Sequence, residues 1–286
     1  MTDFSCADYT FPLLTRSQTL SLLGLLDFRY IDLGLFQRNE HLQTSAMIAA
    51  PAQFASDLVE DLKRSNLQAS DLFLQIGDDP RHASTNDPDD NIRFQNREIF
   101  KYSLELCSKL QCAHMTGLPG VHHGHPSRDF ARAVDEAQWR VDTCSGSGIT
   151  YAIEPHIGSI CADIESTFKL LDAVSDLTLT LDYGHFIAAG HSSEAVHALL
   201  PDSSHMHLRG GAPGRLQTAV QENTIDFNGA LNRLRQLDYT GVLALEYVWI
   251  DWEGCNRSDT LSETLLLRQL ISTITNSLQW KAGWNV

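Results

Sequence analysis

The runs LTLTLDYG (177–184) and SHMHLRG (204–210) decide the fold, because each is a short apolar stretch typical of a buried strand. Six further runs of the same kind are spread along the chain, so eight strands are predicted in all. The other six lie at residues 4–11, 27–36, 71–77, 111–118, 148–155 and 241–249. Their regular recurrence indicates one repeated unit of structure.

Segments with helical spacing separate these runs. In PAQFASDLVEDLKRSNL (51–67), the apolar residues Phe54, Leu58 and Leu62 recur at every fourth position after a proline suited to a first helical turn. Similar patterns occupy residues 97–110, 163–171, 226–237 and 266–274. Alternating strands and helices predict an α/β fold, a (β/α)₈ TIM barrel formed by a single domain of residues 1–286. An open doubly wound sheet is the alternative, but no GxGxxG motif follows the first strand.

The bulk composition excludes several classes of protein. The chain carries 21 basic and 36 acidic residues, which gives a net charge of −15. Proteins that bind nucleic acid need a basic surface to contact the phosphates, so this charge argues against a nucleic-acid partner. No apolar stretch approaches the ~20 residues of a membrane span, and the first residues lack the basic and apolar regions of a secretory signal. The six cysteines are scattered without a CxxC motif, as expected of thiols in a reducing cytoplasm.

The last four predicted strands each end near a residue that can bind a metal. These residues are Glu154 in YAIEPH, Asp182 in LTLDYGH, His207 in HMHLRG and Glu246 in LALEYVW. Active sites of such barrels lie where the strands end, and three carboxylates meeting there would repel one another. One divalent cation would relieve this repulsion, and the mixed nitrogen and oxygen donors suit Mn²⁺, Mg²⁺, Co²⁺ or Zn²⁺. Each residue alone also fits a structural role, but four successive strands with one such residue each favour a metal site.

These residues, with the motifs DYGHF, HMHLRGGAPGRLQ and LALEY, resemble the xylose-isomerase-like TIM-barrel superfamily. That superfamily contains sugar phosphate isomerases and epimerases and the family 2 AP endonucleases. The resemblance implies that Glu154, Asp182, His207 and Glu246 bind one metal ion, with Mn²⁺ preferred. It also implies that Glu154 and Glu246 act as the catalytic acid and base.

The resemblance further implies several substrate-binding residues. His185, three residues after Asp182, matches a position that binds a substrate oxygen. Arg215 is the better match to a substrate-binding arginine, although Arg209 stays an alternative. His156 and His114 are expected to face the same pocket, the latter because it is predicted to lie near the end of its strand.

Two positions refine this picture. His205 lies two residues before His207, on the same strand face, and is expected to lie one layer deeper, where it packs or forms a hydrogen bond within the barrel. Ile160 occupies a position where ketose epimerases of the superfamily carry another substrate-contacting glutamate, so the sugar-binding arrangement differs from that subgroup.

The chemistry that the resemblance implies is proton transfer through a metal-stabilised enediolate. The favoured function is a cytoplasmic sugar or sugar-acid isomerase or epimerase with a small-molecule carbohydrate substrate, and a homo-oligomer is possible. A lyase, either a decarboxylase or a dehydratase acting on a keto sugar acid, is the first alternative. A non-catalytic sugar-binding barrel is the second.

Overall fold

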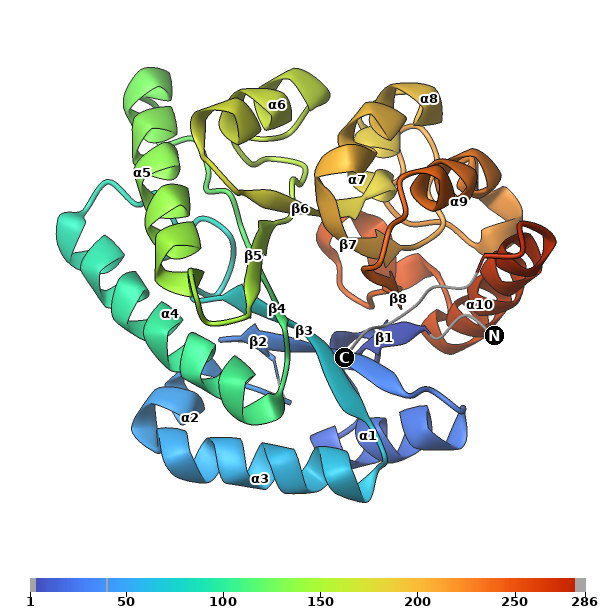
Figure 1. The fold of residues 1–286 in the computed structure, drawn as a ribbon, viewed down its shortest axis with the longest axis horizontal. Coiled ribbons are helices and arrows are strands. Elements are labelled where there is room, and N and C mark those ends of the chain that lie inside the picture. The colour runs from blue at the N-terminus through green and yellow to red at the C-terminus, as the bar shows by residue number, and fades with distance from the viewer. Residues whose placement is uncertain (1–3, 40, 281–286) are drawn as a thin grey trace.

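Eight parallel strands close into a barrel in which neighbours in sequence are neighbours in space (Figure 1). The computed structural model describes residues 4–39 and 41–280, so residues 1–3 and 281–286 of the predicted domain lie outside the described residues. The strands are β1 Ser5–Ala7, β2 Tyr30–Phe36, β3 Gln68–Gln75, β4 His114–Gly117, β5 Thr150–Ile153, β6 Thr178–Asp182, β7 Ser203–Leu208 and β8 Val242–Leu245. Each strand overlaps one of the eight predicted runs, and the predicted (β/α)₈ barrel is confirmed.

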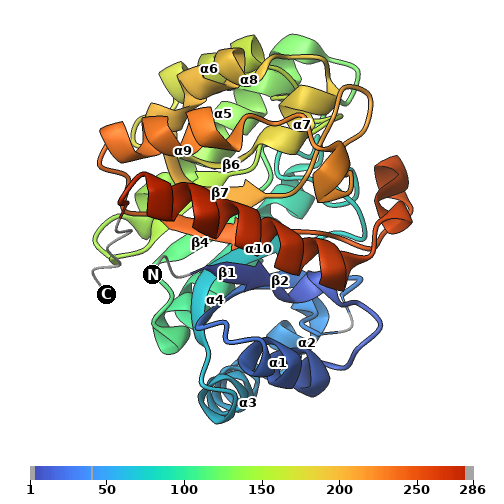
Figure 2. The ribbon, with the colours of Figure 1, turned by 90° about the vertical axis from the view of Figure 1, so that its right-hand side faces the viewer.

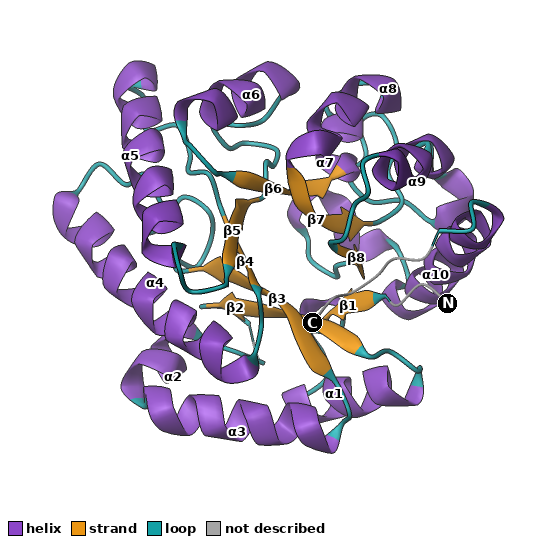
Figure 3. Cartoon of the chain, viewed as in Figure 1, coloured by secondary structure: helices purple, strands orange, loops and turns teal. Residues whose placement is uncertain are grey.

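Helices form a ring outside the strands (Figure 3). The α-helices are α1 Arg16–Leu25, α2 Thr44–Ala49, α3 Pro51–Arg64, α4 Asp90–Leu110, α5 Pro126–Cys144, α6 Ile164–Ala173, α7 Tyr183–Ala188, α8 Ser193–Val196, α9 Phe227–Gln236 and α10 Thr260–Ser277. The short 3₁₀ helices within residues 4–39 and 41–280 are η1 Asp8–Thr10, η2 His197–Asp202, η3 Val220–Glu222 and η4 Trp252–Arg257. Figure 2 shows the last long helix, α10, lying on the outside of the barrel beside α9.

The predicted helices form where their apolar faces meet the strands. In α3, proline stands in the first turn and Leu58 and Leu62 are buried, as the spacing predicts. Asp163 is the N-cap residue of helix α6, and its side chain accepts a hydrogen bond from the backbone of Ser166 in a capping box. Among the described residues, no helix is both long enough and apolar enough to cross a bilayer.

The buried apolar residues form two clusters. The larger fills the space between the strands and the helices. The smaller lies at the carboxyl end of the barrel, where Tyr9, Phe73 and Val248 belong to it and Phe36 packs against it. All six cysteines are free and buried, so disulfides contribute nothing to this packing.

Candidate active site

The four predicted metal ligands gather at the carboxyl ends of β5 to β8. Glu154 directly follows β5, Asp182 is the last residue of β6, and Glu246 directly follows β8. His207 lies next to the end of β7 and pairs in register with Asp182 of β6. None of the four is more than 4% exposed. Their charges therefore interact in a site that is shielded from bulk water.

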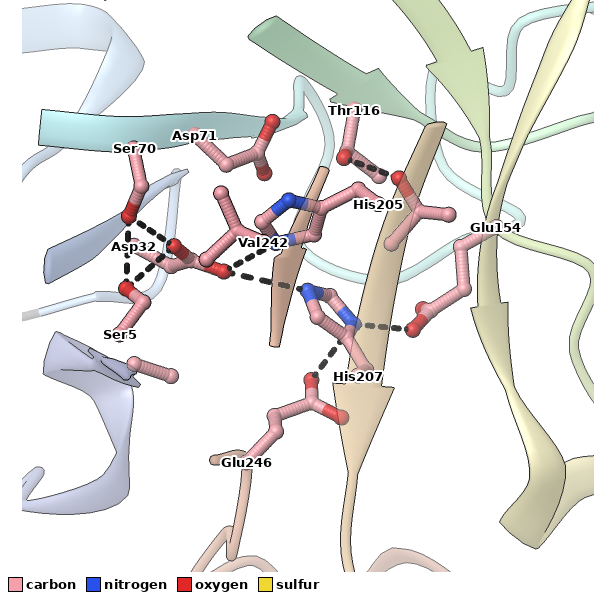
Figure 4. Close-up of polar contacts among 12 residues, drawn as sticks. Ser5, Asp32, Ser70, Asp71, Thr116, Glu154, His205, His207, Val242 and Glu246 are labelled. Atoms are coloured by element: carbon pink, nitrogen blue, oxygen red, sulfur yellow. Dashed lines mark hydrogen bonds and ion pairs between the residues drawn. The ribbon is translucent and has the colours of Figure 1, made fainter. Parts of the chain in front are cut away.

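His207 sits between two glutamates from the strands on either side of the mouth (Figure 4). Its Nδ1 atom lies 2.6 Å from Oε1 of Glu154 and 3.5 Å from Oε1 of Glu246. Burial by itself lowers the pKa of His207, but the carboxylates of Glu246 and Glu154 outweigh it and raise this pKa well above its usual value. This position between the strands thus attracts a positive charge.

Arg209 places a second positive charge at the mouth. Its Nε donates to Oδ2 of Asp182 at 2.7 Å, and its Nη2 pairs with the same oxygen and lies 2.9 Å from Oε2 of Glu246. The guanidinium is buried, and it therefore links the carboxylates that follow β6 and β8. A Cβ at Gly210 would lie 2.7 Å from both the backbone oxygen of Thr218 and the hydroxyl of Tyr247, so these close approaches require glycine after Arg209.

The structure does not bring Arg215, the predicted substrate-binding arginine, to the mouth of the barrel. Its side chain is 51% exposed, and its Nη1 lies 2.8 Å from Oε2 of Glu222 on the outside of the loop. Arg209, the alternative, is the arginine that the structure brings into the site. Arg209 is two residues after His207, so the alternation of a strand turns both side chains inward, whereas Arg215 lies beyond a turn that joins it to Ala212.

The environments of the two glutamates drive their pKa values apart. Burial raises the pKa of Glu246 to about 7, against the opposing effect of Arg209. Burial acts in the same direction on Glu154, but the charge of His207 outweighs it and lowers the pKa of that residue to about 2. The Tyr9 hydroxyl donates to Oε1 of Glu246 at 3.0 Å. At neutral pH one carboxyl group is ionised and the other can carry a proton, which is the separation that acid–base catalysis uses.

Two of the predicted substrate-binding histidines lie at this mouth. His185, in α7, has its Nε2 atom 3.6 Å from Oδ2 of Asp182 and its ring centroid 5.9 Å from that of Trp252. Burial lowers its pKa to about 4, so its ring is neutral at neutral pH. The Nδ1 atom of His156 donates to the backbone carbonyl of Glu154 at 3.2 Å, and its ring lies 6.1 Å from that of His185. Their role in binding substrate stays a prediction.

The prediction that His114 lies near the end of its strand is wrong. His114 is the first residue of β4, and its Nδ1 and Nε2 atoms lie 2.6 Å from Oδ1 of Asp71 and 2.8 Å from Oγ of Ser204. Gln111 adopts a left-handed conformation (φ 55°) that ends α4, so β4 begins later than the predicted run. His114 therefore belongs to the barrel interior below the mouth.

Sequence reasoning missed Asp32, which supports His207 from below. Its Oδ2 atom accepts from Nε2 of His205 at 2.6 Å and lies 3.5 Å from Nε2 of His207. Its Oδ1 atom accepts from Ser5 at 2.6 Å and from Ser70 at 2.5 Å. Asp32 thus orients both histidines of β7, in the way that a carboxylate orients a metal-binding imidazole. A single acidic residue inside the apolar run YIDLGLF was the available signal.

The side chains of the mouth fit a divalent cation. Glu154, His207 and Glu246 each offer a ligand atom, and these atoms lie within 4.8 Å of one another. Oε2 of Glu246 faces Nη2 of Arg209 at 2.9 Å, so a guanidinium balances the charge of this oxygen in the metal-free protein. Asp182 joins a second group, with Glu154 and His185, and Arg209 stands between it and Glu246. The structure thus brings three of the four predicted ligands, Glu154, His207 and Glu246, into one group. Asp182 belongs to a neighbouring group that shares Glu154 with the first.

Comparison with known proteins supports the barrel and its family. Residues 26–269 match the family model described as xylose isomerase-like TIM barrel. No curated protein sequence matches the chain.

Solved structures of low sequence identity share the fold over almost their whole length. A D-allulose 3-epimerase from Methylomonas sp. is 17% identical with a TM-score of 0.71, covering 96% of this chain and 98% of its own. The probable 3-DHS dehydratase AsbF from Bacillus anthracis is 15% identical with a TM-score of 0.68, covering 93% of this chain and 99% of its own. An IOLI protein with a bound zinc atom is 15% identical with a TM-score of 0.72, covering 96% of this chain and 99% of its own.

Proposed function

The chain belongs to the xylose isomerase-like TIM-barrel family, and we propose that it is a divalent-metal-dependent isomerase or epimerase of a sugar or sugar acid. The observation that carries the proposal is the approach of Glu154, which follows β5, and Glu246, which follows β8, to the same nitrogen of His207. Two carboxylates that flank one cation position can reach both sides of a substrate held there. A cytoplasmic location and a homo-oligomeric state stay predictions.

His207, Glu154 and Glu246 would hold the ion. Asp182, which lies near Glu154 in the neighbouring group, is the proposed fourth ligand. Mn²⁺ is the proposed ion, and Mg²⁺, Co²⁺ and Zn²⁺ suit the same donors. When bound, the cation would act as a Lewis acid that polarises adjacent carbonyl and hydroxyl oxygens of the substrate. That role requires a cation that lies next to both glutamates, and both lie next to the same nitrogen of His207.

The glutamates divide the proton transfer between them. We assign Glu154, which is ionised at neutral pH, as the base that removes a proton from carbon. Glu246, beside the same cation position, is the residue that we assign to the return of a proton. Return to the neighbouring carbon gives an isomer, and return to the opposite face of the same carbon gives an epimer.

The remaining side chains orient the substrate and exclude water. His185 is neutral at neutral pH, so its ring can form a hydrogen bond to a substrate oxygen without adding charge. Phe73 packs on His207 with ring centroids 5.8 Å apart, and with Tyr9 it forms part of the apolar cluster over the charged groups. An apolar cover lowers the local dielectric and strengthens the electrostatic interactions below it.

The test combines metal content with proton exchange. The metal content of the purified protein would be measured by elemental mass spectrometry for the wild type, for His207→Gln and for Glu222→Gln. Glu222 is an exposed glutamate outside the site, so its variant is the control. About one equivalent at the mouth is expected in the wild type and in the control, and His207→Gln should lose it.

Keto sugars and sugar acids would then be incubated with the metal-loaded protein in D₂O. Deuterium at the carbon next to the carbonyl, together with an isomer or epimer, is the expected result. Loss of water or carbon dioxide would identify a lyase instead. Metal binding with no exchange and no product from any of these compounds would leave a sugar-binding barrel, and the proposed reaction would be rejected.

A further inference from the structure

Arg209 lies in the gap between two of the four predicted metal ligands. Its Nη2 atom contacts Oδ2 of Asp182 and lies 2.9 Å from Oε2 of Glu246, and its Nε donates to the same Asp182 oxygen at 2.7 Å. Asp182 ends β6 and Glu246 follows β8, so the guanidinium joins the two strands on either side of β7. The side chain is buried, so bulk water does not screen these contacts.

The remaining oxygens of the two carboxylates also have partners within the chain. Oδ1 of Asp182 accepts from the backbone nitrogen of Gly184 at 2.7 Å. Oε1 of Glu246 accepts from the Tyr9 hydroxyl at 3.0 Å and lies on the side of His207 (Figure 4). Neutral donors of this kind are typical of carboxylates that bind a metal. The guanidinium differs from them because its positive charge repels a second cation at the same oxygen.

The grouping of the ligand atoms reflects the position of this side chain. One group contains Glu154 and Glu246 and another contains Glu154 and Asp182, with the ligand atoms of each group within 4.8 Å of one another. Within the described part of the chain, Asp182 and Glu246 share no such group, and Nη2 of Arg209 contacts both. An ion bound by all four predicted ligands therefore needs the oxygens that Arg209 holds.

Arg209 can release these oxygens only by moving. Burial by itself lowers the pKa of its guanidinium, but the carboxylates of Asp182 and Glu246 outweigh it and raise this pKa well above its usual value. A guanidinium keeps its proton throughout the physiological pH range in any case. The loss of a proton therefore cannot free the two carboxylates for an ion.

We propose that Arg209 is an internal competitor for the metal ion of the mouth. Its guanidinium holds Asp182 and Glu246 before an ion binds, and the ion reaches both carboxylates only after the guanidinium has moved off them. The apparent affinity for the ion is then reduced by the fraction of molecules in which Arg209 is displaced. This inference rests on the proposed function, because it concerns the ion that the proposed reaction requires.

The experiment measures Mn²⁺ affinity by calorimetric titration of the full-length wild type, Arg209→Ala and Arg215→Ala. A displaced state populated at about 0.1–10% weakens binding by the inverse of that fraction, so Arg209→Ala should bind Mn²⁺ about 10- to 1,000-fold more tightly than the wild type. Arg215 provides the matched control, because it is half exposed and pairs with Glu222 outside the site. Arg215→Ala should bind Mn²⁺ with the wild-type affinity.

Free guanidinium distinguishes competition for the gap from a mere loss of positive charge. Arg209→Ala leaves space where the guanidinium was, so guanidinium chloride, far below the concentrations that unfold the protein, should weaken Mn²⁺ binding to this variant. Urea has a similar planar shape without the charge and should have no effect, and sodium chloride gives the baseline for ionic strength. The wild type should stay at that baseline, because its own side chain fills the gap.

Arg209→Met is the second variant, because its side chain fills the space without a charge. It should bind Mn²⁺ more tightly than the wild type and should not respond to guanidinium. If Arg209→Ala folds poorly, Mn²⁺ and guanidinium should each raise its thermal unfolding midpoint.

The outcomes separate this proposal from the proposed function. Affinities of both Arg209 variants at or below the wild-type value, or tight binding to Arg209→Ala that guanidinium does not weaken, would overturn the proposal, while Mn²⁺ binding by the wild type would still support the proposed function. Binding by the Arg209 variants but not by the wild type would support the competition and reject a metal-dependent reaction. Binding by none of the proteins would overturn both.

Discussion

Nη2 of Arg209 lies 2.9 Å from Oε2 of Glu246, and the two form a buried ion pair at the carboxyl end of the barrel. The same guanidinium pairs with Asp182, so one cation holds two carboxylates from either side of β7. Removing one member of a buried ion pair is costly because the remaining charges stay buried without compensation.

Arg209→Met is therefore expected to lower the free energy of unfolding of the metal-free protein by about 3–5 kcal/mol. Arg215→Met is the matched control, because the ion pair of Arg215 is half exposed and such pairs contribute about 0–1 kcal/mol. Denaturant unfolding at neutral pH measures both values. Equal losses in the two variants would show that Arg209 does not support the site.

The acid–base roles predict the kinetics of two conservative variants. Glu154→Gln and Glu246→Gln keep the size of each side chain but cannot transfer a proton, so solvent-deuterium exchange should slow by about 10²–10⁴-fold. The measurement is made at saturating metal, which separates proton transfer from metal binding. Glu222→Gln should exchange at the wild-type rate. Exchange that stays within about twofold of wild type in either site variant would remove that glutamate from the mechanism.

Metal binding at the mouth should depend on pH. Glu246 has a raised pKa of about 7 and therefore holds a proton below that value, and a bound cation must displace it. Affinity is expected to fall as the pH drops below about 7, and because the pKa of His207 is also raised, affinity should continue to rise with pH above that value. Calorimetric titration with Mn²⁺ at several pH values, in buffers with different ionisation enthalpies, counts the protons released. The two test values, about pH 5.5 and about pH 8, lie on either side of the Glu246 pKa of about 7. Mn²⁺ binding of equal strength at both would contradict the raised pKa of Glu246.

Tyr9→Phe should move the same pH dependence to higher pH. The Tyr9 hydroxyl donates to Oε1 of Glu246 and stabilises its ionised form, so its loss should raise the pKa of Glu246 further. The midpoint of Mn²⁺ affinity against pH is the quantity to compare with wild type. A midpoint that is unchanged or lower would show that this hydrogen bond has no influence on the glutamate.

Helix α6 offers a test of stability that is independent of the site. Asp163 caps this helix, and Asp163→Ala should cost about 0.5–2 kcal/mol, whereas Asp163→Asn retains a capping oxygen and should cost less. Hydrogen bonds from the backbone of Ser166 lower the pKa of Asp163 below its value in the unfolded chain. Its extra stabilisation is therefore present above about pH 3.9 and is lost as the pH falls through the folded-state pKa. Denaturant unfolding of all three proteins at neutral and acid pH should show the wild-type advantage over Asp163→Asn only at the higher pH.

The strands and the ring of ligand-type residues could be predicted because the signal for each is local. A buried parallel strand is a continuous apolar run, and a carboxylate at its end stands out against that run, as Glu154 does. The position of Arg209 followed from the same alternation that was applied to His205 and His207, but the loop motif favoured Arg215. The left-handed cap at Gln111 left no comparable signal, so the start of β4 and the position of His114 were misjudged.

The interior contacts could not be predicted, because they join residues that are far apart in sequence. Asp32 and His205 are separated by 173 positions and meet only when the barrel closes. A buried acidic residue within a strand needs a hydrogen-bond or ion-pair partner. The sequence alone does not show which strand supplies that partner. The register of β2, β7 and their neighbours determines that choice, and register is a property of the closed sheet.

The link from Asp182 through Arg209 to Glu246 bears on the order of events during biosynthesis. With Arg209 and a protonated His207 already balancing the carboxylates of the mouth, the chain can complete its barrel before any ion reaches that site. Loading of the proposed ion would then follow folding, and the supply of metals in the surroundings would select which ion is taken up. One batch of purified protein could accordingly be stripped and reloaded with different ions, so that their effects are compared on the same folded molecules.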